Sequence, residues 1–372
     1  MDGTYARRLD DRDLQAIGVM MSIARQGMGV ASALLIALVC GALFIAATGS
    51  DPLQVYSTML VETLGTSYGI GQVLFKATTL IFTGLSAAIC FRAGLFNIGG
   101  EGQLMAGAFL IAVAGAFGGG LSPVVMIPLC ILAGIAGGAL WALVPGILKA
   151  RFGSHEVINT IMMNYIAAAL VGFLVNSVFG VPATVHTAVI AEGAQLPRLD
   201  NLFGLFQGSP ANASFLLAVL CCVLVWLFFA RTRWGYELRA VGLNPVAAAC
   251  ARIDVPSRYA IALLLSGAFA GLGGSNFVMG YKRYYEIGFS DNAGFIGIAV
   301  ALLSNNNPIG VIFASLFFAL LEYGGLTINV LVPKELVTIL QAIVILLVVV
   351  LSKLFNDRFA VSRRHLFAGG GV

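Results

Sequence analysis

The sequence predicts an all-α protein that crosses a membrane about ten times, and three observations point to this fold class. Of the 372 residues, 59% are hydrophobic and only 10% are charged, whereas soluble domains carry about 25% charged residues. The apolar runs are long and continuous, unlike the alternating segments of roughly ten residues that form transmembrane β-strands. The 45 glycines are typical of membrane helices that pack closely. A water-soluble domain is therefore excluded, and a porin-like barrel is disfavoured.

A helix needs about 20 apolar residues to cross the hydrocarbon core, and ten segments approach that length. The first five expected spans are residues 27–49, 73–91, 104–118, 123–148 and 156–180. The other five are residues 214–230, 259–280, 290–304, 309–325 and 336–352. We therefore expect a membrane domain over residues 27–352, between a charged N-terminal segment, 1–26, and a tail, 353–372.

The positions of Lys and Arg predict the orientation, because cytoplasmic loops carry an excess of both. With ten spans, the basic N-terminal segment, the loop after the fourth span, the loop 231–258 and the tail all fall on one side. Both termini are therefore expected in the cytoplasm. Lys282 and Arg283 fall on the outer side, so the topology is most open to correction at the seventh and eighth spans.

Two polar, glycine-containing breaks suggest an inverted repeat. The stretch 91–103 leads into the third span and the stretch 289–295 into the eighth, and both combine Gly, Asn and an acid. In the expected topology they enter from opposite faces, as an inverted repeat of spans two to five on spans seven to ten requires. A chance likeness between two glycine-rich breaks is the alternative.

The break at residues 91–103 is the sharpest candidate for a solute pathway. It sets Asn97, Glu101 and Gln103 among four glycines, whose missing side chains let the backbone leave helical geometry. Irregular backbone at membrane depth requires cover by protein or a wet cavity, and an acid beside a span is a functional candidate. An ordinary cytoplasmic loop between two helices is the competing interpretation.

Further polar candidates follow in the fifth span. Thr160 and Asn164 lie four residues apart and share one helical face. Asn164 and Tyr165 suit either a polar solute or a neighbouring helix as a hydrogen-bond partner, and aromatic rings suit stacking on a flat solute. The expected pathway residues are Phe96, Asn97, Glu101, Gln103, Asn164, Tyr165, Asn292 and Phe295.

The basic loop 231–258 is expected to hold a short helix outside the membrane. Asn244 suits the cap of that helix and Pro245 its first turn, and an alanine-rich run follows. We expect this element to dock a cytoplasmic partner, with a plain solvated loop as the alternative. Inside the membrane, glycines at every fourth position, Gly134 with Gly138 and Gly267 with Gly271, predict close helix packing.

Several kinds of chemistry lack their motifs. No Gly-Lys pair is present, so the chain has no P-loop for ATP. Its three histidines are scattered, and its six cysteines have no metal-ligand spacing. We expect no catalytic residues, no metal site and no cofactor, and the net charge of +4 does not indicate nucleic acid.

Three of these motifs together resemble the permease subunits of bacterial ABC importers for nucleosides and simple sugars. They are the Asn-Ile-Gly-Gly-Glu-Gly-Gln run at 97–103, the segment 156–165 and the Arg-Ala-Val-Gly-Leu-Asn-Pro run at 239–245. The resemblance covers roughly residues 70–350, and the first two motifs are most similar to the nucleoside branch.

The resemblance implies a core of two permeases, this chain and an identical or different one, surrounded by lipid in the bacterial inner membrane. It also implies cytoplasmic ATPase subunits, which alone use ATP, and an extracytoplasmic binding protein or lipoprotein. The loop 235–253 is similar to the region that meets the ATPase, and this implies coupling roles for Glu237, Arg239, Gly242, Asn244 and Pro245. Family members usually have Gly where this chain has Arg252, which puts the geometry of that contact in question.

The expected function is therefore ATP-driven import of nucleosides or related small polar solutes by alternating access. Permeases for ribose, galactose or branched-chain amino acids are alternatives within the family. An ion- or proton-coupled secondary transporter is the alternative of another class, although the fourth, sixth and tenth spans carry no buried acid for coupling. A membrane-embedded enzyme ranks last, because no nucleophile or metal set is visible.

Overall fold

The computed structural model describes residues 38–47 and 49–329, together with single positions at 32, 35, 36, 331, 332, 338, 339, 342, 343, 346, 347 and 350. The expected N-terminal segment, the tail, part of the first expected span and most of the tenth lie outside these residues. The chain divides into two compact units, residues 56–330 and a second made of residues 1–55 and 331–372. The first unit carries the candidate functional sites described below.

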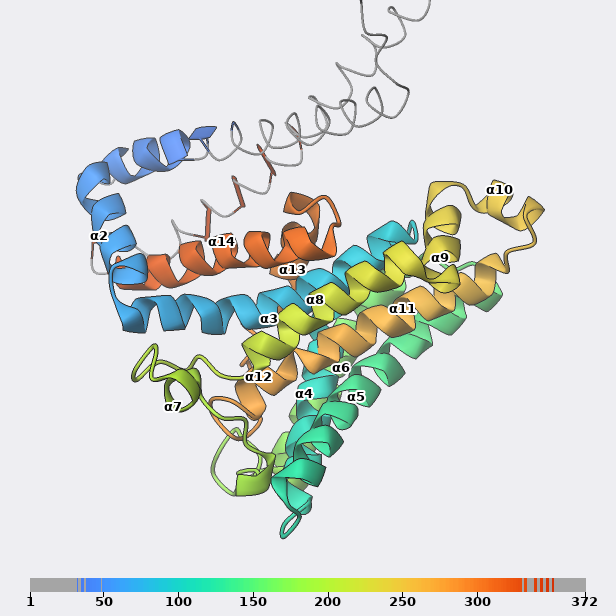
Figure 1. Cartoon of the computed structure of the whole chain (residues 1–372), viewed down its shortest axis with the longest axis horizontal. Helices are drawn as coiled ribbons and strands as arrows, with labels where there is room; N and C mark the ends of the chain where they lie inside the picture. Colours follow the sequence, from blue (N-terminus) through green and yellow to red (C-terminus); the bar gives the residue numbers. More distant parts are fainter. Residues whose placement is uncertain are drawn as a thin grey trace, which may run out of the picture. The chain divides into compact units, whose positions relative to one another are not determined.

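Within the described residues the secondary structure is helical, with isolated β-bridges but no named strand (Figure 1). The first helices are α2 (Pro52–Leu64), α3 (Ser67–Arg92), α4 (Gly100–Phe117), α5 (Pro123–Phe152), α6 (Glu156–Leu174) and the short α7 (Leu199–Phe203). The remaining helices are α8 (Ser214–Arg231), α9 (Arg233–Leu243), α10 (Pro245–Cys250), α11 (Val255–Leu272), α12 (Gly274–Val278), α13 (Ala293–Leu303) and α14 (Pro308–Thr327).

Seven helices in the described part of the chain are long and apolar enough to cross a membrane. They coincide with the second to seventh and the ninth expected spans, which confirms a multi-spanning all-α fold. The eighth expected span needs correction: α13 has 11 residues, about 16 Å of helix, and does not cross a bilayer by itself. Helix α2 was not expected, because Asp51 and Glu62 bracket its apolar residues; with residues 38–47 it forms an eighth candidate span.

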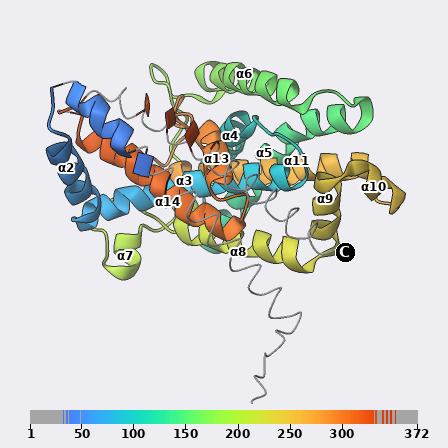
Figure 2. The same ribbon diagram turned by 90° about the horizontal axis from the view of Figure 1, so that it is seen from above.

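The first helix of each expected repeat packs mainly on the second and third helices of the other repeat. Helix α3, the first of one repeat, packs mainly on α13 and α14, the second and third of the other. Helix α11, the first of the second repeat, packs in turn on α4 and α5 (Figures 1 and 2). Such reciprocal packing accords with two repeats related by a two-fold axis, and the inverted repeat itself stays a prediction. Helix α6 packs on α4 and α5, and its counterpart belongs to the expected tenth span, most of which is not described.

The α5–α11 contact confirms the packing expected from the glycine spacing. A Cβ added at Gly138 would overlap the carbonyl oxygen of Gly267, and one added at Gly271 would overlap the carbonyl oxygen of Gly134. Only a helix pair with no side chains at these positions reaches this backbone separation. The pair therefore forms a seam between the two repeats in which backbone contacts backbone.

Helices α9 and α10 lie together beyond the ends of α8 and α11, while α7 lies at the opposite end (Figures 1 and 2). Near the α7 end, Lys282 pairs with Glu286 at 3.4 Å and lies over the rings of Tyr281 and Tyr284. Partial desolvation opposes the charge of Lys282, but the Glu286 carboxylate outweighs it and raises the pKa of Lys282. A basic residue that violates the expected charge distribution thus has a local acidic partner.

Candidate functional site

The stretch between α3 and α4 is an irregular segment buried among helices. Helix α3 ends in a Schellman motif, in which Gly94 adopts φ +73° and the Leu95 N–H donates to the Cys90 carbonyl at 2.9 Å. The chain then runs without helical structure to Gly99, and α4 begins at Gly100. This segment carries the first group of expected pathway residues.

Asn97 is the centre of a buried hydrogen-bond network. Its amide nitrogen donates to Gln103 Oε1 at 2.9 Å and to Ser266 Oγ at 2.7 Å, and its Oδ1 accepts from the Gly99 N–H. The Ser266 hydroxyl on α11 also lies 2.8 Å from that of Ser86 on α3. Each polar atom is satisfied inside the chain, as burial in the membrane requires. The network therefore links α3, α4 and α11.

Glu101 lies where the N-terminal ends of α4 and α13 meet. Its carboxylate accepts hydrogen bonds from the Ser290 hydroxyl and, at 2.7 Å, from the Gly294 N–H. A Cβ at Gly294 would overlap the backbone of Glu101, so the two helix ends touch directly. Both ends carry the positive pole of a helix dipole, and one buried carboxylate compensates the two together.

Helix α6 attaches to the same segment through the face that carries Thr160 and Asn164. Asn164 accepts from the Gly102 N–H at 2.9 Å and donates to the Ile98 carbonyl at 3.0 Å, and Thr160 accepts from the Ile98 N–H at 3.2 Å. The expectation that these two side chains share one face is confirmed. Of the alternatives for Asn164, the bond to a neighbouring element is the one seen.

The expected pathway residues thus divide into two groups. Asn97, Glu101, Gln103 and Asn164 are brought together and buried, whereas the other four are exposed on the isolated chain: Phe96, Tyr165, Asn292 and Phe295. Contact of either group with a solute stays a prediction. The exposed group supplies three aromatic rings. Two of them, those of Phe96 and Phe295, are on backbone next to residues that the buried group binds, Asn97 itself and Gly294, whose N–H donates to Glu101.

Several buried polar residues were not anticipated. Asn276 in α12 donates to the Phe75 carbonyl at 2.8 Å and to Thr79 Oγ1 at 3.0 Å, and it accepts from the amide of Asn212. Ser266 and Ser290 were likewise missed as partners of Asn97 and Glu101. A single polar residue within an apolar run is a detectable signal, but its partner lies far away in the sequence. Among the described residues, no three His, Cys, Asp or Glu side chains gather as a metal site would require.

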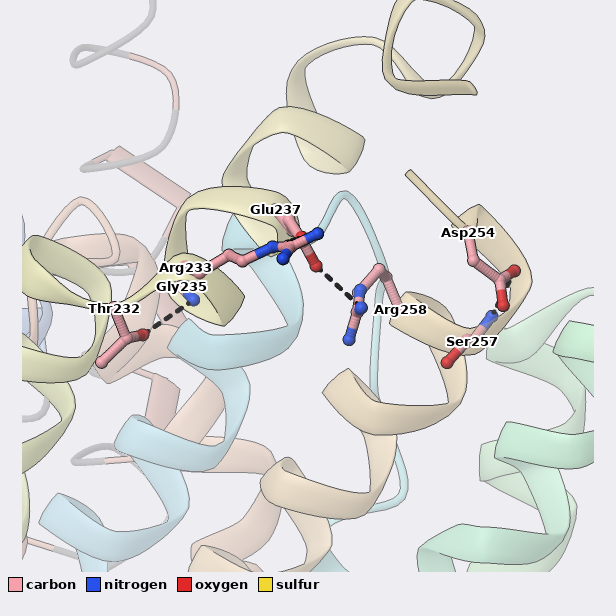
Figure 3. Close-up of polar contacts among 7 residues, drawn as sticks. All are labelled: Thr232, Arg233, Gly235, Glu237, Asp254, Ser257 and Arg258. Carbon is pink, nitrogen blue, oxygen red and sulfur yellow. Dashed lines mark hydrogen bonds and ion pairs between the residues drawn. The ribbon is translucent and has the colours of Figure 1, made fainter. Parts of the chain in front are cut away.

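The second region comprises α9, α10 and the start of α11, and Glu237 lies at its centre (Figure 3). The Glu237 carboxylate pairs with Arg233 at 2.7 Å and with Arg258 at 2.8 Å. Thr232 caps α9 by accepting from the Gly235 N–H, and the Arg258 guanidinium lies 5.3 Å from the centre of the Trp234 ring. The pair with Arg258 joins α9 to the start of α11, whereas the pair with Arg233 lies within α9.

The expected coupling residues divide into those packed against the protein and those exposed on its surface. Glu237 is buried, and Gly242 packs on the backbone of Arg92 and Ala93 at the end of α3. Arg239, Asn244 and Pro245 are exposed.

At α10, the expected cap is confirmed: Asn244 Oδ1 accepts from the Val246 and Ala247 N–H groups, both at 3.0 Å. At its other end, Arg252 adopts φ +60° in a Schellman motif closed by the Ile253 N–H on the Ala248 carbonyl. This left-handed conformation favours glycine, which gives a physical reason for the Gly expected at that position.

Comparison with known proteins found a matching family and several similar proteins. Residues 69–349 match the family described as branched-chain amino acid transport system / permease component. The chain is 38% identical to the guanosine ABC transporter permease protein NupP of Bacillus subtilis, covering 85% of this chain and 91% of that protein. It is 35% identical to the nucleoside ABC transporter permease protein NupB of Lactococcus lactis, covering 86% and 89%. It is 36% identical to the glucose ABC transporter permease protein TsgB13 of Haloferax volcanii, covering 85% of each chain.

Proposed function

The chain belongs to the family of branched-chain amino acid transport system permease components, and on that premise we propose that it is the membrane-spanning permease subunit of an ABC importer of nucleosides. The observation that carries the proposal is its similarity, over 85% and 86% of its length, to permeases of guanosine and nucleoside transporters. In this proposal the subunit is not an enzyme. ATP is hydrolysed by separate cytoplasmic subunits, and the permease converts their movement into alternating access.

The proposed ATPase contact is the exposed part of α10 and the turn before it. Leu243 and Val246 are exposed apolar side chains beside Pro245, and Arg239 and Arg252 add positive charge. An apolar tip with basic neighbours suits a groove with an acidic rim on a partner. The proposal places this end, and both chain termini, in the cytoplasm of a bacterial cell, with a second permease beside the chain and a binding protein or lipoprotein outside.

The proposed solute contacts are the exposed aromatic and amide side chains near the polar segment. Phe96 and Phe295 offer faces on which a flat nucleobase stacks, and Asn292 and Tyr165 offer hydrogen bonds to ribose hydroxyls. The buried group around Asn97 acts in this proposal through the backbone that it holds. A sugar permease shares the stacking surface, so the solute class has to be measured.

The test is uptake by the complete complex in proteoliposomes, with its ATPase, second permease and binding protein. We expect ATP-dependent uptake of radiolabelled guanosine that unlabelled nucleosides inhibit and a hundredfold excess of glucose, ribose or leucine does not. Inhibition by glucose or ribose would instead make the chain a sugar permease. Uptake that continues when the ATPase subunit is omitted would favour the ion-coupled alternative and overturn the proposal.

A further inference from the structure

The short helix α13 is held at both ends by one stretch of the first repeat, residues 92–101. At its N-terminal end, the Glu101 carboxylate accepts from the Gly294 N–H at 2.7 Å. Just beyond its C-terminal end, Arg92 Nε donates to the Asn306 carbonyl at 2.7 Å. Because α13 has 11 residues, the two bonds act on one element only about 16 Å long. The stretch 92–101 and α13 are therefore tied together at two points.

Between these two points, α13 packs tightly on α3. The Thr83 hydroxyl donates to the Ala293 carbonyl at 3.0 Å, and a Cβ added at Gly297 would lie 2.5 Å from Thr83 Oγ1. A Cβ added at Gly84 would lie 2.6 Å from a methyl carbon of Val300. Close-packed surfaces of this kind move together instead of deforming. The second half of α3, the stretch 92–101 and α13 thus form one rigid unit, called the α3–α13 unit below.

Helix α9 touches the α3–α13 unit through backbone, without intervening side chains. A Cβ added at Gly242 would overlap the carbonyl oxygen of Arg92, and one added at Gly94 would lie 3.0 Å from the Cα of Gly242. Gly94 has φ +73°, so glycine is favoured there for conformation as well as space. A contact with no side chain has no rotamer that can absorb a displacement.

We propose that Gly242 of α9 drives the α3–α13 unit through Gly94, and that Arg92 makes α13 follow. The proposal rests on the proposed function, because it treats α9 as the element that ATPase subunits move. Arg92 is a positioning residue in this proposal. Its guanidinium also lies 4.9 Å from the centre of the Phe229 ring on α8, so a contact with α8 orients the side chain in addition to its hydrogen bond to Asn306. From Gly94, three residues of chain lead to Asn97 and seven to Glu101, so the displacement reaches the polar segment directly.

The first experiment measures solute transported per ATP hydrolysed by the full complex in proteoliposomes. Gly242→Ala forces α9 away from the Arg92 carbonyl, and Arg92→Gln removes the guanidinium without adding bulk. We expect this ratio to fall about tenfold for Gly242→Ala and severalfold for Arg92→Gln, as loss of coupling between sites predicts, while basal ATP hydrolysis persists. Arg92→Lys keeps the charge and a donor, so it should recover part of the ratio.

Gly172→Ala on α6 is the matched control, because no heavy atom lies within 4 Å of a Cβ added there. It should leave the ratio unchanged. An unchanged ratio in assembled Gly242→Ala and Arg92→Gln complexes would overturn the proposal. If the wild-type complex moves no solute, the proposed function fails, and the second experiment still tests the inference.

The second experiment follows hydrogen–deuterium exchange in the detergent-solubilised complex on addition of ATP. We expect exchange in residues 92–101 and 293–306 to change together in the wild type. In Arg92→Gln the change in 92–101 should persist while that in 302–306 falls at least twofold, as expected when one of two ties to an element is lost. Independent changes of the two segments in the wild type, or an unaltered joint change in Gly242→Ala, would contradict the proposed route.

Discussion

Two glutamates of the same chain, Glu101 between α4 and α13 and Glu237 on α9, are each 5% exposed, yet they are stabilised in different ways. Glu101 accepts hydrogen bonds from a hydroxyl and a backbone N–H, and no basic side chain pairs with it among the described residues. Glu237 pairs with two arginines, Arg233 and Arg258. The comparison separates two ways to keep a carboxylate buried: backbone dipoles at helix ends, or opposite charges.

The difference suits the two locations. At the junction of α4 and α13, the carboxylate of Glu101 accepts from one neutral side chain, Ser290, and from the backbone N–H of Gly294, so part of its stabilisation comes from the helix end itself. At α9, the partners are side chains of unequal exposure, 86% for Arg233 and 17% for Arg258. Removing one carboxylate should therefore loosen a helix junction, whereas removing the other should leave a partly buried cation unpaired.

The largest effect is expected for Glu237→Gln. It leaves Arg258 without a carboxylate, and breaking a buried pair in this way costs about 3 kcal/mol or somewhat more of unfolding free energy. Thermal unfolding of the purified protein in detergent measures the loss. Arg233→Ala is the control, since an exposed partner contributes less than about 1 kcal/mol. Equal losses for the two variants would show that Arg258 is not the dependent partner, and rescue by Glu237→Gln with Arg258→Met would confirm that it is.

A smaller loss is expected for Glu101→Gln. The variant keeps the volume of the side chain but removes the charge from two helix N-termini, which costs about 2 kcal/mol for charge-assisted hydrogen bonds. Ser290→Ala removes one neutral donor and should cost about half as much. Both are measured in the same unfolding assay. A loss at Glu101→Gln that exceeds the loss at Glu237→Gln would reverse the proposed order of the two environments.

Next comes Asn244→Ala at the start of α10. It removes the oxygen that accepts from two backbone N–H groups, and loss of such a cap costs about 1 kcal/mol. Because α10 is short and exposed, we expect faster hydrogen exchange in residues 246–250 and little change elsewhere. Asn244→Ser retains an acceptor and should restore most of the protection. Unchanged exchange in Asn244→Ala would mean that the cap does not hold this helix.

The smallest effect is a gain, for Arg252→Gly at the other end of α10. A non-glycine residue at φ +60° carries about 1 kcal/mol of strain, part of which the added freedom of the unfolded glycine offsets. We expect stabilisation by about 0.5 kcal/mol in the unfolding assay. Arg252→Ala tests the cause, because it removes the charge but keeps the strain and should bring no gain. A gain as large in Arg252→Ala would assign the effect to charge.

Sequence reasoning predicted what depends on local composition and spacing. The charge-free runs predicted seven of the long helices, Asn244-Pro245 predicted the start of α10, and Gly138 and Gly267 predicted a close helix contact. These follow from rules that act over a few residues: hydrophobic length, side-chain capping and the missing Cβ. For the same reason, α2 was missed, since its apolar run is short and flanked by acids.

By itself, the sequence determined that the chain spans a membrane, which residues form most of its long helices, and which polar stretch interrupts them. Tertiary structure alone decided what that stretch touches. It assigned Ser290 and Gly294 to Glu101, Ser266 to Asn97 and the Arg92 backbone to Gly242. Each of these contacts except the last joins residues more than 160 positions apart, and the last, between α3 and α9, still joins residues that are not neighbours in sequence. The physical reason is that a buried polar group is satisfied by whichever helix packing brings beside it, and packing is a property of the whole chain.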